Sequence, residues 1–327
     1  MADTQKKYSF SECPAPVKVD TISLLKRLER PVGPIDVILD TDTYNEIDDQ
    51  FALAYLIANS EKLNLKAICA APFFCNGKST SPADGMYKSY DEILHVLSLM
   101  NRNDLISCVY HGSEDYLADE NTPQISEASE RIAELAMLYS PDKPLYVIAI
   151  GAITNVASAV IAHPEIRDNI VLVWLGGHAL HWPDTHEFNM MQDIAAARVV
   201  MGCGMALVLL PCMGVVSGFT TGEHELRYHL EGKNALCDYL VSNTVNEVRS
   251  VANIRSTAWT RVIWDVTAVA WLLDGQFMED YIISSPIPEY DFRWGSDARR
   301  HPIRYVYHIH RDRLFADLFE KLAAYGK

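Results

Sequence analysis

The sequence VILDTDTYNEIDD, residues 37–49, joins a short apolar run to a dense group of acids. The apolar run is typical of a buried strand, and a helical pattern follows the acids, so the acids fill a strand-to-helix turn. Further apolar runs predict strands at 65–70, 145–150, 170–175 and 206–210. Helical patterns between them cover 48–59, 89–100, 126–139, 153–162 and 194–201. This alternation predicts an α/β fold with an open, mostly parallel sheet flanked by helices.

The rest of the chain extends this plan without a clear linker. Residues 1–33 are rich in proline and predict an N-terminal extension, and residues 34–327 predict a single domain. A polar helical stretch at about 223–256 predicts an insertion over the sheet. A helix is expected at 258–273, followed by a strand at 304–310 and a closing helix at 312–324.

The charge of the chain is strongly negative and unevenly placed. Its 327 residues include 28 Lys and Arg against 43 Asp and Glu, a formal net charge of −15. No basic residue lies between Arg30 and Lys62, whereas seven acids do. Such a surface repels phosphate backbones and anionic lipid, which disfavours nucleic-acid and membrane-surface partners and favours a bound cation.

Cysteine usage and hydropathy limit the cellular compartments in which we expect the protein. The seven cysteines form no Cys-x-x-Cys pair, which argues against a zinc ribbon, a dithiol redox motif or a secreted disulfide framework. The N-terminus lacks the apolar core of a signal peptide, and no apolar run approaches the roughly 18 residues of a membrane span. We therefore expect a soluble, cytoplasmic protein.

The acids of residues 40–49 exceed what a helix cap requires. One of Asp48 and Asp49 is expected to cap the following helix, but capping needs only one carboxylate. Confining Asp40 and Asp42 beside them, without Lys or Arg, raises their pKa values unless a cation offsets the repulsion. Oxygen ligands suit Ca²⁺ or Mg²⁺. The stretch therefore predicts a metal site at the carboxyl edge of the sheet.

Three later segments place polar groups at strand or helix ends. The strand at 145–150 runs into Gly151 and a helix that begins near Thr154. The strand at 170–175 ends in Gly-Gly, and the following loop delivers Glu187 and Asn189. Asp265, after Trp264, stands among apolar residues, where an unpaired carboxylate is costly to bury and needs a partner such as a metal.

These four blocks, in this order, resemble the signature of the inosine-uridine preferring nucleoside hydrolases and cover residues 35–271. The resemblance implies an open parallel α/β fold and a tightly bound Ca²⁺. It also implies hydrolysis of the N-glycosidic bond of a ribonucleoside to ribose and free base, by a protein that is usually a homo-oligomer. The small-molecule partner would be a nucleoside.

The resemblance also implies roles for individual residues. Asp42 matches the catalytic aspartate that activates a metal-bound water. The implied metal ligands are Asp42, Asp49, Thr154 (through its main-chain carbonyl) and Asp265. The implied substrate-binding residues are Asp48, Asn76, Glu187 and Asn189. These roles suit an oxocarbenium-like transition state, which nearby carboxylates stabilise.

The sequence also departs from the family in the segments expected to lie near the base of the nucleoside. Residues 43–46 replace the usual Pro-Gly and leave two extra residues before Asp48, which places residues 44–46 near the sugar. Trp264 stands where many members have a histidine, so the acid that protonates the leaving base is unassigned. Its candidates are His111, His178, His181 and His186. Stacking of the base is the alternative, on Tyr44, Trp182 or Trp264.

Two other functions fit parts of the sequence. The residues Asp40-Thr41-Asp42-Thr43 after a strand also fit the nucleophile motif of haloacid-dehalogenase-like phosphatases, although the later acidic pair that this chemistry needs is missing. A non-catalytic, Ca²⁺-dependent nucleoside or sugar binder is the second alternative. The retained Asp42 argues against it, and the missing histidine argues for it.

Overall fold

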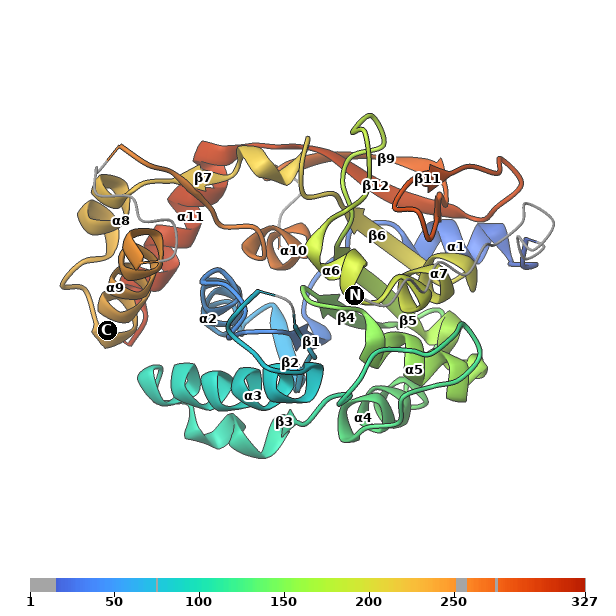
Figure 1. Ribbon diagram of the computed structural model, residues 1–327, viewed down its shortest axis with the longest axis horizontal. Coiled ribbons are helices and arrows are strands. Elements are labelled where there is room, and N and C mark those ends of the chain that lie inside the picture. Colours follow the sequence, from blue (N-terminus) through green and yellow to red (C-terminus); the bar gives the residue numbers. More distant parts are fainter. Residues whose placement is uncertain (1–15, 75, 251–257, 274–275, 327) are drawn as a thin grey trace.

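An eight-stranded sheet forms the centre of the computed structural model, which describes residues 16–74, 76–250, 258–273 and 276–326 (Figure 1). The strand order is β3-β2-β1-β4-β5-β6-β12-β9, and all neighbours pair in parallel except β12 and β9. The strands are β1 (Ile35–Thr41), β2 (Leu63–Ala70), β3 (Val109–Tyr110), β4 (Leu145–Ala149), β5 (Ile170–Leu175), β6 (Ala206–Leu210), β9 (Met278–Ser284) and β12 (Pro302–Ile309). This confirms the predicted α/β class.

Helices cover both faces of the sheet (Figure 1). Because side chains of a strand alternate between faces, Val37 and Leu39 of β1 enter one core and Ile38 enters the other. The first core is shared with α2 (Asp49–Ala58), α3 (Pro82–Leu99), α10 (Val266–Trp271) and α11 (Arg311–Ala324). The second is shared with α4 (Glu127–Ala136), α5 (Thr154–Ala162) and α7 (Ile194–Gly202). The apolar β1 is thus buried on both sides, as a central parallel strand requires.

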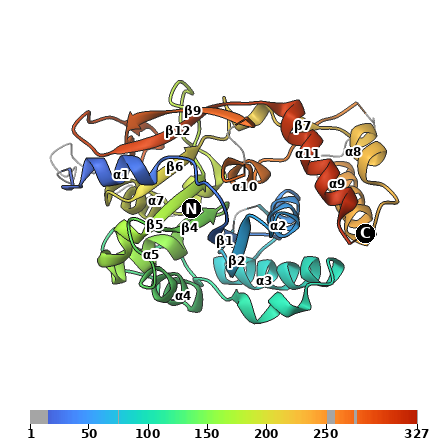
Figure 2. The same ribbon diagram turned by 180° about the vertical axis from the view of Figure 1, so that it is seen from behind.

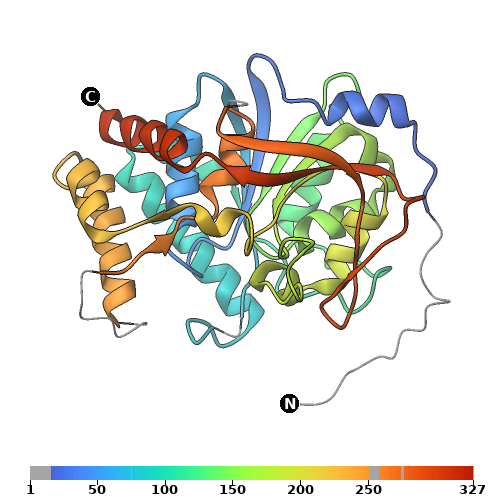
Figure 3. The same cartoon turned by 90° about the horizontal axis from the view of Figure 1, so that it is seen from above.

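The expected insertion consists of two helices, α8 (Glu223–Leu230) and α9 (Ala235–Ser250), over the part of 223–256 that the structure describes. They lie at one end of the molecule, where α8 contacts α11 and α9 contacts α3 (Figure 3). Short elements complete the fold: β7 (Thr220–Thr221), β8 (Arg261–Val262), β10 (Ile287–Pro288), β11 (Trp294–Gly295), α6 (Phe188–Gln192), η2 (Asn103–Cys108), η3 (Pro164–Asn169) and η4 (Val216–Gly218).

The helix predicted at 258–273 is wrong in extent. Only Val266–Trp271 is helical, because Arg261–Val262 pairs antiparallel with Thr220–Thr221 and extends the chain before Asp265. Strand β9 was not predicted either. Buried and exposed positions alternate only weakly along β9, so a pattern of period 2 gives little signal there.

Part of the predicted N-terminal extension packs on the domain. Helix α1 (Thr21–Arg27) begins at Asp20, whose side chain accepts hydrogen bonds from the amides of Ile22 and Ser23. It contacts β6 and β12 and lies in front of them in Figure 2, and Arg27 donates to the main chain and carboxylate of Asp168. The boundary at residue 33 stays a prediction. None of the described helices is long and apolar enough to cross a membrane.

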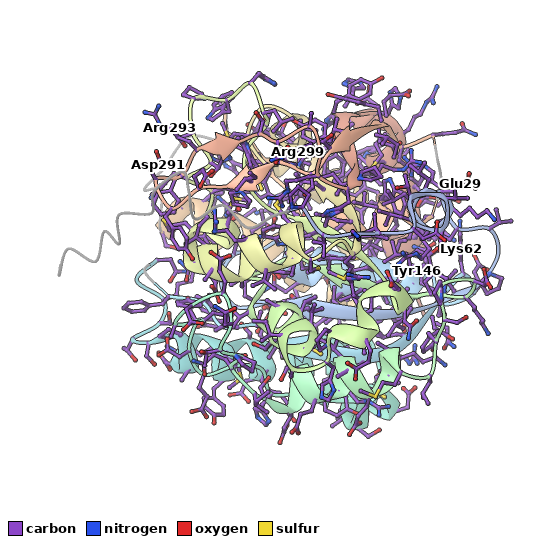
Figure 4. The ribbon with its side chains drawn as sticks, turned by 90° about the vertical axis from the view of Figure 1, so that its right-hand side faces the viewer. Glu29, Lys62, Tyr146, Asp291, Arg293 and Arg299 are labelled. Atoms are coloured by element: carbon purple, nitrogen blue, oxygen red, sulfur yellow. The ribbon has the colours of Figure 1, made fainter. Side chains whose placement is uncertain are left out.

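The parallel strands of the sheet begin at one side of the molecule and end at the other. In Figure 4, Glu29, Lys62 and Tyr146 lie along the side where strands begin, and Asp291 and Arg293 lie toward the opposite side. Four neighbouring strands, β1, β4, β5 and β6, end together there. The segments with candidate residues therefore meet at this edge, where parallel α/β proteins bind their ligands.

Candidate active site

Asp40, the penultimate residue of β1, supports the edge from within the sheet. It is fully buried, and the side-chain amide of Asn155 donates to its Oδ1 at 2.8 Å and to the Ala70 carbonyl at 3.3 Å. The backbone amide of Ser113 in turn donates to Asn155 Oδ1 at 2.8 Å. Burial raises the pKa of Asp40 to about 7. One amide side chain thus ties β1, β2 and the start of α5 together.

Asp42 follows β1 directly and is almost completely buried. Its main-chain carbonyl accepts from the Asn45 amide at 2.7 Å, which starts the turn, whereas its Oδ2 has no hydrogen-bond partner among the described residues. Burial and the neighbouring Asp49 raise the pKa of Asp42 well above its usual range. Gly151 gives the carboxylate room, because a Cβ there would stand 3.0 Å from Asp42 Oδ1.

The start of α2 carries two buried carboxylates that do not cap it. Asp48 holds the N-cap position, but its side chain makes no capping hydrogen bond there, so the expected capping role does not apply to it. Asp49 instead accepts from the Thr41 hydroxyl at 2.5 Å. Burial raises the pKa of Asp49 to about 7, and burial followed by Glu46 raises that of Asp48.

Asp265 brings a third carboxylate to this point from α10. Although 217 positions of sequence separate Asp48 from Asp265, ligand oxygens of Asp48, Asp49 and Asp265 all lie within 4.8 Å of one another. Burial and then Asp48 raise the pKa of Asp265 well above its usual range. Oxygens this close can share one cation, since Ca²⁺ binds its oxygen ligands at about 2.3–2.6 Å.

Glu187 and Asn189 form the other wall of the site. Glu187 caps the short helix α6 and accepts from the amides of Asn189 (3.0 Å), Met190 (3.0 Å) and Gly177 (2.9 Å). Its pKa is raised by burial, which these three amides oppose. Asn189 donates its side-chain amide to the carbonyls of Ile150 (3.1 Å) and Leu175 (3.0 Å). This wall is thereby fixed to the ends of β4 and β5.

A cavity of about 250 Å³ lies between these two walls, where α10 stands between α2 and α6 (Figure 1). Of the predicted site residues it brings together Asp42, Asp48, Asp49, Glu187, Asn189 and Asp265. Residues of the long turn after β1, Asn45 and Glu46, also line it, as does Trp264. No Lys or Arg is among its described lining residues.

Two predicted residues lie outside the cavity lining. Thr154 is buried at the start of α5, where its hydroxyl donates to Asp193 Oδ2 at 2.7 Å, and Ile150 lines the cavity in that part of the chain. Asn76 is exposed, and its side-chain amide donates to Asn45 Oδ1 at 2.5 Å. Asn76 therefore touches a lining residue rather than the cavity itself.

The structure separates the four candidate histidines. His178 and His186 line the cavity, whereas His111 stacks on Tyr90 at 3.9 Å and bonds to Glu127, away from it. His181 is exposed and is not among the lining residues. The Met213 amide donates to His178 Nδ1 at 3.3 Å, and burial lowers the pKa of His178, so both features disfavour its protonated form.

Of the three aromatic candidates for base stacking, only Trp264 lines the cavity. Tyr44 is 42% exposed and Trp182 is 37% exposed, and neither is among the lining residues. Sequence patterns did not indicate Arg261, whose guanidinium donates to Glu46 Oε2 at 2.7 Å. No local pattern could have indicated it, because the two residues are 215 positions apart.

Comparison with known proteins agrees with this arrangement. The family model of the inosine-uridine preferring nucleoside hydrolases matches residues 37–313. The chain belongs to this family. Membership in this family argues against the phosphatase alternative and agrees with the order of the four sequence blocks.

The names of the relatives that match this chain specify different substrates. A pyrimidine-specific ribonucleoside hydrolase RihA of Enterobacter sp. (strain 638) is 28% identical over 198 residues, which cover 54% of this chain and 59% of RihA. The match thus spans less than two thirds of that relative's length. A plant nucleoside hydrolase, PpNRh1, has a TM-score of 0.70 at 18% identity and covers 89% of this chain and 99% of its own.

A purine-preferring ribonucleoside hydrolase from Gardnerella vaginalis also has a TM-score of 0.70, at 17% identity, over 88% of this chain and 98% of its own. At these identities the likeness of both structures to this chain shows a shared fold. One relative is named for pyrimidines and one for purines.

Proposed function

We propose that this protein hydrolyses the N-glycosidic bond of a ribonucleoside, with Ca²⁺ held by the acidic wall of the cavity. The observation that carries the proposal is the group of four buried aspartates, 42, 48, 49 and 265, in a cavity with no Lys or Arg among its described lining residues. Buried carboxylates without cationic partners are costly, and a divalent cation offsets that cost.

The donor set fits a hard cation. Asp42 Oδ2 is buried without a partner among the described residues, and Asp48, Asp49 and Asp265 present oxygens at sharing distance. The main-chain carbonyl of Thr154, at the start of α5, is the further oxygen ligand that the family resemblance implies. An all-oxygen set favours Ca²⁺ or Mg²⁺ over zinc or copper. When bound, the cation supplies Lewis acidity toward the ribose hydroxyls and the attacking water.

The chain's own residues then divide the work. The Asp42 carboxylate accepts a proton from the attacking water, which bonds to the anomeric carbon as the bond to the base breaks. Asp48, Glu187 and Asn189 bind ribose hydroxyls. Because Glu187 is held by three backbone amides, its position is fixed before substrate arrives, which favours stabilisation of the positive charge that develops on the sugar.

The partner and compartment are also part of the proposal. The net charge of −15 supports a small nucleoside over a nucleic acid as the partner. We further propose that the protein is a homo-oligomer, as the family resemblance implies, and that it is cytoplasmic, as its cysteine usage favours.

A panel of purine and pyrimidine ribonucleosides, assayed for released reducing sugar with Ca²⁺ or with a chelator, tests the function. We expect turnover with Ca²⁺ and its loss with chelator. Asp36→Asn is the matched control for Asp42→Asn, because Asp36 lies at the other end of β1, bonded to Tyr139 and Lys66. Ca²⁺-dependent nucleoside binding without turnover would instead support the non-catalytic binder.

A further inference from the structure

Carboxylates dominate the charge of the cavity, and not all of them belong to the four aspartates that we propose to hold Ca²⁺. Its described lining residues include six acids and no Lys or Arg, namely Asp42, Glu46, Asp48, Asp49, Glu187 and Asp265. One divalent cation would offset two of these charges. Glu187 is neutralised in part by three amide dipoles, so the acid that stands apart from both groups is Glu46.

The chemistry of ribose places Glu46 at the base end. If the acidic wall holds the 2′,3′ edge of the sugar, the base and the 5′ group point to opposite ends of the cavity. Trp264, which precedes Asp265, contributes an aromatic side chain to the lining, and Asn45 and Glu46 line the cavity from the turn before Asp48. The 5′ group then faces Glu187 and His178.

Glu46 is held in place rather than free to turn away. Its Oε2 accepts from the Arg261 guanidinium at 2.7 Å, and Arg261 also bonds to Glu247 at 3.1 Å. Glu247 in turn pairs with Lys78 at 2.6 Å. This chain of ion pairs joins the β2–α3 loop, α9, β8 and the β1–α2 turn. Arg261 is not among the lining residues, so the cavity meets the carboxylate and not the guanidinium.

The same end has no evident acid for a departing base. Trp264 replaces the expected histidine, and its indole N–H does not release a proton at neutral pH. The two histidines that line the cavity, His178 and His186, belong to the segment that leads to Glu187, which we assign to the 5′ end. His178 also accepts the Met213 amide at Nδ1, which disfavours the imidazolium. A neutral base that leaves as an anion would therefore meet a carboxylate and find no proton. A base that leaves from a cationic state would not need one.

We propose that this cavity selects N-ribosides whose base carries a fixed positive charge, such as pyridinium ribosides, and that Glu46 is the specificity-determining residue. The proposal rests on the proposed hydrolase function. In the reaction, water oxygen bonds to the anomeric carbon, its proton passes to Asp42, and the C–N electron pair returns to the ring nitrogen. The base leaves neutral. Trp264 adds cation–π attraction to the charged ring before it leaves.

Hydrolysis of nicotinamide riboside, nicotinic acid riboside and uridine by the Ca²⁺-loaded protein tests the proposal. Because a pyridinium riboside is intrinsically more reactive, the readout is the nicotinamide riboside-to-uridine ratio of kcat/KM in variants relative to the unaltered protein. We expect Glu46→Gln to lower this ratio about tenfold, the effect of one nearby charge at short range. Nicotinic acid riboside, with its added carboxylate, should be a poorer substrate than nicotinamide riboside.

Glu247→Gln is the matched control, since it removes the other acidic partner of Arg261 without touching the cavity. We expect it to leave the ratio within about twofold, as for a partly exposed ion pair. An unchanged ratio in Glu46→Gln, or equal turnover of the two pyridinium ribosides, would overturn the inference. Turnover of uridine alone would overturn it and leave the hydrolase function standing.

Binding measured by calorimetry distinguishes failure of the proposed hydrolase function from failure of the proposed selection of cationic bases. Nicotinamide riboside and its neutral dihydro form differ by two electrons and one proton but have nearly the same shape. If no riboside is hydrolysed, the proposed function fails. Tighter binding of the cationic form, weakened by Glu46→Gln, would still support the selection of cations. Equal binding of both forms would overturn it.

Discussion

The two walls of the cavity bury carboxylates in opposite ways. On the α6 wall, Glu187 receives three backbone amides within about 3 Å, so its charge is satisfied by the fold itself. On the α2–α10 wall, Asp42 keeps a buried oxygen without a partner among the described residues, and burial, followed by neighbouring carboxylates, raises the pKa values of Asp48 and Asp265. One wall is complete as folded protein, and the other calls for a cation. The following experiments test this difference.

The largest expected effect comes from the incomplete wall. Asp42→Asn should lower kcat/KM for any hydrolysed riboside by about a thousandfold, because the side-chain amide cannot take the proton of the attacking water. Steady-state rates with Ca²⁺ measure this. The stability of the apo variant should not fall, since a repelling charge is removed. Asp36→Asn should keep its activity, and retention of activity in Asp42→Asn would refute the assigned role.

Removal of the cation should weaken the whole protein. Ca²⁺ that binds only the folded state stabilises it by about 2.7 kcal/mol at a hundred times its Kd. Thermal unfolding with Ca²⁺ and with chelator should therefore show a rise in Tm of several degrees. Asp265→Asn should shrink that rise, whereas Glu187→Gln should preserve it. An equal loss in both variants would erase the distinction between the walls.

The pH dependence of the apo protein should follow from the raised pKa values. Folding raises the pKa of Asp49 to about 7 from a usual value of 3.8. The protonated form is therefore favoured in the folded state, and its contribution to stability is full below about pH 4 and is lost as pH rises through 7. Urea unfolding without metal should give a lower free energy of unfolding at pH 8 than at pH 5. Ca²⁺ should reduce this slope, because it favours the ionised carboxylates.

The smallest effect is expected on the complete wall. Glu187→Gln replaces one acceptor oxygen with an amide group that cannot accept from the backbone, so at least one hydrogen bond to Gly177, Asn189 or Met190 is lost. The free energy of unfolding should fall by about 1–3 kcal/mol. Chemical denaturation measures it, and the loss should be the same with and without Ca²⁺. A Ca²⁺-dependent loss would mean that Glu187 contributes to the metal site.

The sequence predicted best where the signal is local. The strands at 37–39, 65–70, 145–150, 170–175 and 206–210 are confirmed, because central parallel strands are apolar on both faces. The placement of Asp42, Asp48 and Asp49 at one strand-to-helix turn follows from the same pattern. Glu187 after a strand and Asp265 among apolar residues also stand out locally, and the family signature groups them with Asp42. Their catalytic and binding roles remain proposals.

The sequence predicted worst where distant contacts decide. The helix expected at 258–273 is shortened because Arg261–Val262 finds a strand partner at Thr220–Thr221. Ile150 lines the cavity and Thr154 does not, which depends on where β4 ends and α5 begins, and such boundaries are the least certain part of pattern reading. The role of Thr154 as a metal ligand stays a prediction. The pairing of Glu46 with Arg261 leaves no local trace at all.

The hydrogen bonds of Asn155 make the position of Asp42 independent of the length and sequence of the turn that follows it. Because its side chain holds Asp40 and the Ala70 carbonyl, the end of β1 is anchored to β2 and α5 behind the turn. The turn of residues 43–46 can then lengthen or change its side chains without displacing Asp42. In the proposed hydrolase, this scaffold would let the turn that we assign to base recognition diversify while the Asp42 carboxylate keeps its place. For protein engineering, this turn is accordingly the segment in which to randomise residues when a new leaving group is sought.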